Sequence, residues 1–165
     1  MRKETEVLAD MLDMTRQATK YYLNKLSGTD LHTYFKTERG DSLNSAFWII
    51  AHLTVIENWL VLYSSYGKAE RITWGKQYGL GEPAPAREES PSWDEVSQLF
   101  NSVHERSLSH ILSLKDEDLD KPTRSGETFD GEDSCRKVIM HAIRHEGIHT
   151  GHLTWLCKMH GIKTV

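Results

Sequence analysis

The stretch "RHEGIHTGHL", residues 144–153, contains the string H-E-x-x-H as His145-Glu146-Gly147-Ile148-His149. On a helix this spacing places two histidines on one face, and in many zinc proteases the string supplies two metal ligands and a general base. The stretch therefore predicts a helix that carries a metal site. Which class of metal protein it belongs to depends on what the rest of the chain places around that helix.

Helical periodicity appears in four segments, and no segment alternates convincingly like a strand. We expect helices over about residues 4–26, 44–66, 92–114 and 133–160. Residue types that begin and end helices support these bounds. They are Asp41, Ser42 or Asn44 as N-cap of the second helix, Ser92 with Glu95 as a capping box of the third, Asp133 or Ser134 at the start of the fourth, and Gly67 and Gly161 as stop signals.

Long connections come after the second and third predicted helices. Residues 67–92 hold three of the four prolines and four of the eleven glycines, and residues 116–133 are strongly acidic. A loop as long as the first of these is usually functional or binds a partner. One short and two long loops joining four helices predict an all-α four-helix bundle, with residues 1–165 forming a single domain.

Composition narrows the function classes. The chain is 38% hydrophobic and 27% charged with a formal charge of −4, so it resembles a soluble protein and offers no general attraction for nucleic acid. No apolar run approaches the roughly 18–20 residues that cross a bilayer, and the start lacks the apolar core of a signal peptide. Cys135 and Cys157 match neither a redox motif nor a disulfide framework. A cytoplasmic protein with free thiols and no membrane partner is expected.

Four histidines share one stripe of the fourth predicted helix. With His145 at zero and about 100° per residue, His149 falls near +40°, His141 near −40° and His152 near −20°. Apolar residues occupy the same arc, so it is the face that a bundle buries. A single histidine on such a face is more often a hydrogen-bonded core residue than a ligand. Burying several imidazoles is costly unless each nitrogen finds a partner, and a metal ion provides one.

A third ligand is required for a tight site, and the second predicted helix offers His52. His52 lies mid-helix within "NSAFWIIAHLTVIENWL", on an apolar stripe. Taken alone it would be a core residue, but its inward position opposite the pair on the fourth helix favours a ligand. The remaining histidines are weaker candidates: His104 and His110 lie in no comparable constellation, and His32 and His160 lie at loop or helix ends.

The protease interpretation fails because the C-terminal segment supplies no ligand of the type and spacing that zinc proteases use. The residues after His149, "TGHLTWLCKMHGIKTV", contain no Glu or Asp to serve as a downstream ligand. The extended form H-E-x-x-H-x-x-G-x-x-H fails as well, because Gly151 comes two residues after His149 rather than three. Strands that would align a peptide are also missing from the predicted elements.

With "WIIAHL" at Trp48–Leu53 and "HEGIHTGHL" at His145–Leu153, the sequence resembles the DinB/YfiT-like superfamily of metalloenzymes. Members of that superfamily are four-helix bundles, generally homodimeric, with an inward histidine on helix two and H-x-x-x-H-x-G-Q-L on helix four. The resemblance covers nearly the whole chain. Here His152 replaces the commoner glutamine.

The resemblance implies that His52, His145 and His149 bind a divalent metal, zinc or nickel, with open positions for water or substrate. It also implies a small-molecule substrate and a homodimer. Characterised members include S-transferases that use a low-molecular-weight thiol, so a thiol cosubstrate is an expectation, as is hydrolysis. The alternative is a non-catalytic dimeric bundle whose metal is structural or whose cavity binds a small ligand.

Several roles stay open from the sequence alone. His141 and His152 are candidates for a fourth ligand, an outer hydrogen-bond donor or a substrate contact. Glu146 and His152 are weak catalytic candidates, although an interhelical ion pair suits Glu146 better. Gly147 and Gly151 predict close approach of another helix, within the bundle or across a dimer, because mid-helix glycine costs about 1 kcal/mol. Trp74, Tyr78 and Trp93 are candidates to roof the site, line a dimer contact or simply pack.

Overall fold

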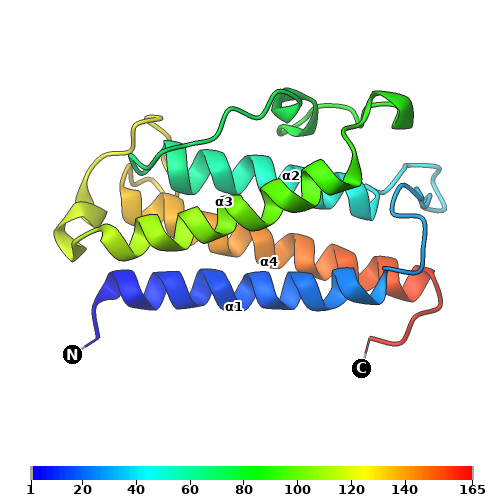
Figure 1. Cartoon of the computed structure of the whole chain (residues 1–165), viewed down its shortest axis with the longest axis horizontal. Helices are drawn as coiled ribbons and strands as arrows, with labels where there is room; N and C mark the ends of the chain where they lie inside the picture. Colours follow the sequence, from blue (N-terminus) through cyan, green and yellow to red (C-terminus); the bar gives the residue numbers. More distant parts are fainter. Residues whose placement is uncertain (1, 165) are drawn as a thin grey trace.

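The computed structural model describes residues 2–164 and consists of four long helices (Figure 1). They are α1 (Glu4–Lys25), α2 (Ala46–Glu57), α3 (Trp93–Ser113) and α4 (Cys135–Met159), with α2 continuing as a π-helix, η1 (Asn58–Tyr63). Short 3₁₀ helices lie in the connections: η2 (Gly75–Tyr78), η3 (Arg87–Glu89) and η4 (Asp116–Asp120). Within residues 2–164 extended pairing is limited to two isolated bridges, Lys36 with Ser42 and Phe129 with Glu132. The predicted all-α four-helix architecture is therefore confirmed.

The order of the helices around the bundle explains the long connections. α1 packs against α3 and α4, and so does α2, which puts α1 and α2 at diagonal corners. In Figure 1, α2 and α3 run in the same direction, so residues 64–92 must travel back along the bundle before α3 begins. The first connection, residues 26–45, is also long. The prediction of a short first loop was wrong, because this connection crosses the end of the bundle to the diagonal corner.

Helix ends follow local hydrogen-bonding chemistry. Ser45, not the predicted Asp41, Ser42 or Asn44, caps α2 by accepting a hydrogen bond from the Trp48 backbone. Ser92 and Ser134 cap α3 and α4 in the same way. Only the serine half of the predicted capping box forms, since the Glu95 carboxylate accepts a hydrogen bond from the Trp74 indole at 2.8 Å instead. That bond ties the connection of residues 64–92, which we call the long loop, to α3.

The hydrophobic core has two parts. One surrounds the first half of α2 and includes Phe47, Ile50, Phe100 and Leu153. The other lies toward the opposite end of the bundle, and its buried members are Leu8, Ala9, Leu12, Leu60, Val61, Ile111, Leu119, Val138, Ile139, Ala142 and Ile143. Between them each helix contributes a buried residue with an ionisable side chain to one connected group. These residues are Arg16 (α1), Glu57 (α2), His104 (α3) and Glu146 (α4). We call these four residues the polar layer.

The second helix is more apolar than its sequence first suggests. Residues 46–63 reach the length and mean hydropathy, 1.4, of a membrane-spanning segment, which corrects the expectation that no run approaches that length. However, 78% of the segment is buried inside the bundle. Its apolar character is that of a central core helix, which has neighbours on most sides.

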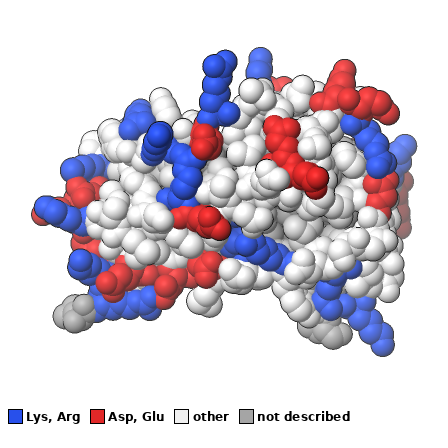
Figure 2. Space-filling model, viewed as in Figure 1, with Lys and Arg blue, Asp and Glu red and all other residues white. Residues whose placement is uncertain are grey.

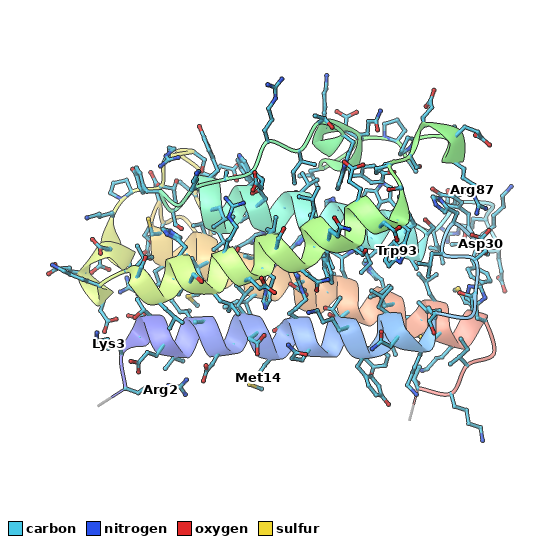
Figure 3. All side chains as sticks on the ribbon, viewed as in Figure 1. Arg2, Lys3, Met14, Asp30, Arg87 and Trp93 are labelled. Carbon is cyan, nitrogen blue, oxygen red and sulfur yellow. The ribbon has the colours of Figure 1, made fainter. Side chains whose placement is uncertain are left out.

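Charged side chains are spread over the surface. On the face drawn in Figure 2, lysines and arginines are intermixed with aspartates and glutamates, without one extended patch of a single sign. Some of them join separate loops: Arg87, the first residue of η3, donates to Asp30 at 2.8 Å and so connects the long loop to the first connection (Figure 3). The long loop is therefore fixed at several points along its path over α2.

Candidate metal centre

His52, His145 and His149 lie together where α2 faces α4. One nitrogen from each ring lies within 4.8 Å of the other two, and the rings are 4.7 to 5.0 Å apart between centroids. The Nε2 atoms of His52 and His145 are 3.2 Å apart. A tetrahedral zinc ion with Zn–N bonds of about 2.0–2.1 Å separates its nitrogen ligands by about 3.3 Å. The spacing of the first pair therefore already suits a metal ion, and small ring rotations would bring in the third.

The tautomer of the His52 ring is fixed by the long loop. Its Nδ1 lies 2.6 Å from the backbone carbonyl oxygen of Tyr78, and a carbonyl only accepts, so Nδ1 carries the hydrogen. In a neutral ring Nε2 is then a bare lone pair directed at His145. Trp48 stacks on this ring at 4.5 Å and holds its orientation. A backbone carbonyl behind the distal nitrogen is the arrangement that most metal-bound histidines have.

His149 has a comparable partner on its own helix. Its Nδ1 lies 3.3 Å from Nδ1 of His152, which leaves Nε2 available for the centre. His152 itself is exposed and is not among the three clustered ligands. The structure therefore places His152 behind His149 as a hydrogen-bond partner. Histidine in place of the commoner glutamine keeps a polar group at that position.

The histidines are held neutral by burial. Removal from water, reinforced by the neighbouring imidazoles, lowers the pKa of His145 to about 4 and that of His149 to about 3. Burial also lowers the pKa of His52, although the hydrogen bond to Tyr78 opposes it. Neutral imidazole is the form that binds a metal ion. Three neutral, converging nitrogens at ordinary pH fit a divalent metal well.

Glu146 points away from this centre into the polar layer. Its Oε1 accepts from Arg16 Nε at 2.6 Å and from the Thr19 hydroxyl at 2.8 Å, and its Oε2 accepts from Arg16 Nη2 at 3.1 Å. Both oxygens are engaged, so the glutamate of H-E-x-x-H forms an interhelical ion pair between α1 and α4. No substrate at the histidines can reach it, since it is 2% exposed.

The other histidines have separate partners. His141 lies one turn before His145 and stacks on Phe129 at 3.9 Å, outside the three-ligand cluster. His104 belongs to the polar layer, and His110 lies against Ser65. At the other end of the bundle, His32 stacks on Phe47 at 4.0 Å, and His160 meets the Phe35 ring edge-on at 4.9 Å. Both of these histidines are half-buried.

Two cavities open at the histidines. The first cavity, about 580 Å³, reaches His52 and His145 from the side of η1 and the two long loops. The second cavity, about 460 Å³, touches all three histidines and Trp48. Leu80 and Glu82 of the long loop line both cavities. His52 and His145 are therefore accessible from two sides, and His149 from the second cavity.

A model of the DinB superfamily matches residues 11–153, a range that contains all three histidines. The chain belongs to the DinB superfamily. Comparisons with curated proteins and with solved structures returned no match. Membership of the DinB superfamily confirms the resemblance drawn from the two histidine motifs.

Two contributions to this centre could not be recognised in the sequence. Tyr78 contributes through its backbone carbonyl, which no side-chain pattern reveals. The π-helix η1 is the other; it carries Asn58, whose side-chain amide exchanges two hydrogen bonds with the Glu70 backbone, at 2.8 and 3.0 Å, and so anchors the loop over the first cavity. The available signals for the polar layer were charged residues within mainly apolar segments, Arg16 on the buried face of α1 and Glu57 in α2.

Proposed function

We propose that this DinB superfamily member is a divalent-metal-dependent enzyme whose ligands are His52, His145 and His149. The observation that carries the proposal is the convergence of three neutral imidazoles, one of them held by a backbone carbonyl, at the meeting point of two cavities. Three protein ligands leave a coordination position for water or substrate, which is typical of catalytic rather than structural sites. Zinc and nickel both suit an all-imidazole donor set.

When bound, the metal would lower the pKa of a thiol or a water molecule and so supply a nucleophile at neutral pH. The chain's own residues do the rest. Trp48 and the Tyr78 carbonyl hold His52 in one tautomer, and His152 orients His149. The cavities admit a small-molecule substrate and, for S-transfer, a low-molecular-weight thiol. We therefore propose transfer of such a thiol or hydrolysis as the reaction class.

The first test is metal content. Protein made without a histidine tag and without added metal should contain about one zinc or nickel ion per chain by elemental analysis, as three-histidine centres do. Protein that neither contains nor takes up a stoichiometric amount of zinc, nickel or manganese would contradict the proposal.

The second test separates chemistry from a structural metal. Cobalt-substituted protein should change its visible spectrum when a thiol is added, because an open coordination position accepts it. Metal-loaded protein should then form adducts between one thiol and one electrophile of a panel, measured by mass spectrometry. A spectrum that no thiol, azide or imidazole changes would favour the alternative, a non-catalytic bundle with a closed metal site.

We further propose that the chain acts as a homodimer in the cytoplasm. Gly147 and Gly151 lie on the exposed side of α4, and a Cβ on Gly151 would meet no heavy atom within 4 Å. The bundle itself therefore supplies no reason for the two glycines. Ile148 and Trp155, both exposed, lie on the same helix beside them. Contact with α4 of a second copy would explain the glycines and cover this apolar surface. Both cysteines are free and buried, which suits a reducing compartment.

A further inference from the structure

The first cavity has mainly apolar walls. Val55, Ile56 and Trp59 line one side, from the helix formed by α2 and η1, while Ile72 and Phe129 reach it from the two long loops. His52 and His145 lie at its inner end. A cavity of about 580 Å³ falls in the range that holds a small organic molecule rather than a lone ion or water.

The charges around the first cavity are weighted toward negative. Its charged lining consists of Glu70, Lys76, Glu82 and Glu127. Glu70 is paired with Arg106. Among the described residues, Glu82, Glu127 and Lys76 have no ion-pair partner. The unpaired charges that line the cavity are therefore two carboxylates and one ammonium group. No arginine of the described chain lines the cavity, and arginine is the residue that recognises carboxylates and phosphates by paired hydrogen bonds.

His141 adds one oriented donor to this apolar surface. Arg144 donates from Nη2 to Nδ1 of His141 at 2.8 Å, and a guanidinium can only donate. The neutral ring therefore carries its hydrogen on Nε2. Stacking on Phe129 at 3.9 Å holds the ring in the cavity wall. A ligand with an oxygen or nitrogen acceptor would find its partner here.

Leu80 is an apolar side chain left in water at the mouth of the first cavity. It is 89% exposed and lies between Gly79 and Gly81, the latter with a φ of +77°. Exposed leucines are common, but this one lines both cavities that meet at the histidines. A ligand with an apolar body would contact Leu80 and remove part of its side chain from water.

We propose that the first cavity binds a small, predominantly apolar substrate that carries no net negative charge and accepts a hydrogen bond from His141. This proposal rests on the proposed function in one respect: the reacting group of the substrate would lie at His52 and His145. Binding of the apolar body in the cavity does not depend on the metal. Glu82 and Glu127, which we call the acidic rim of the first cavity, disfavour anions by charge repulsion.

The test uses three probes with one skeleton and different charge: 2-naphthylmethanol, 2-naphthylmethylamine and 2-naphthoate. Dissociation constants are measured by calorimetry on metal-free protein, so that the carboxylate cannot bind a metal directly. We expect the alcohol to bind by accepting from His141. The amine, an ammonium ion at neutral pH that can only donate, should bind through its attraction to Glu82 and Glu127, and the naphthoate about ten-fold more weakly than the alcohol. Equal or tighter binding of the naphthoate, or no binding of any probe, would overturn the proposal.

Variants identify the cavity as the binding place. Phe129→Ala should weaken all three probes, whereas Met14→Ala, on the outer side of α1 (Figure 3), should weaken none. The double variant Glu82→Gln, Glu127→Gln should bring the naphthoate close to the alcohol. His141→Phe keeps a ring but loses the donor and should weaken the alcohol, and His141→Gln should restore part of the loss. An unchanged charge preference in the double variant would count against the acidic rim.

The outcome is separable from that of the metal proposal. His149 lines the second cavity and not the first. His149→Ala should therefore lose metal but still bind the naphthalene probes. Probe binding without metal uptake would contradict the proposed enzyme alone, and metal uptake without probe binding would contradict the substrate assignment alone.

Discussion

Arg16 on α1 and Glu146 on α4 form an ion pair in the middle of the bundle, with Nε and Oε1 2.6 Å apart and both side chains almost inaccessible to solvent. Arg16 also pairs with Glu57 of α2 and donates to the Phe100 carbonyl of α3 at 2.6 Å. One guanidinium thus joins all four helices between the two parts of the core. Burial alone would raise the pKa of Glu57, but the charge of Arg16 and the hydrogen bond from His104 lower it.

Glu146→Gln should destabilise the fold by about 3 kcal/mol, because it leaves part of a buried guanidinium charge uncompensated. The free energy of unfolding is measured by urea denaturation. Asp30→Asn, at the exposed pair with Arg87, is the matched control and should change stability by less than about 1 kcal/mol. If the two variants lose equal stability, the polar layer does not hold the bundle together.

His149→Ala and His145→Ala should each abolish stoichiometric metal uptake and leave the helical circular dichroism nearly unchanged, since each removes one of three ligands. His152→Ala should only weaken metal affinity, by about 10- to 100-fold, because it acts through the orientation of His149. Affinity is measured by competition with a chromophoric chelator. Complete loss of metal in His152→Ala would instead make His152 a direct ligand.

The metal-free protein should lose stability as the pH falls below about 6.5, the ordinary histidine pKa. The folded pKa values of His145 and His149 are depressed, to about 4 and about 3, so the unfolded chain takes up protons first. Unfolding is therefore favoured progressively between about pH 6.5 and those values. Melting temperatures of the wild type and of the double variant His145→Gln, His149→Gln should be compared across this pH range. The wild type should show the steeper decline, and parallel curves would rule out the depressed pKa values.

Gly151→Leu should dissociate the proposed homodimer, because a bulky side chain would hold the two α4 helices apart. Sedimentation velocity measures the change in mass. Ser109→Leu, exposed on α3, is the control and should leave the mass unchanged. In a protein that is monomeric, Gly151→Ala would simply stabilise α4 by about 1 kcal/mol, since the site is open.

Helical periodicity and local sequence chemistry predicted the helices and the three histidines that the structure brings together. The cap of α3 at Ser92 was predicted correctly, and Ser134, one of the two residues predicted at the start of α4, is its N-cap, because capping involves residues within one turn. The i, i+4 spacing of His145 and His149 was enough to place them side by side. The start of α2 was misplaced by a few residues, since several N-cap residue types precede it and only one, Ser45, makes the hydrogen bond.

The sequence by itself determined four amphipathic helices and a pair of histidines on one helix face, because periodicity acts over neighbouring turns. The sequence favoured His52, 93 positions before His145, as the third member of the cluster, and the tertiary structure brings its Nε2 to 3.2 Å from that of His145. Only the tertiary structure decided that a backbone carbonyl of the long loop fixes the His52 tautomer. It also decided that Glu146 pairs with Arg16 rather than serving the histidines. These choices depend on which helix faces which across the bundle, and that arrangement is set by the packing of the whole core.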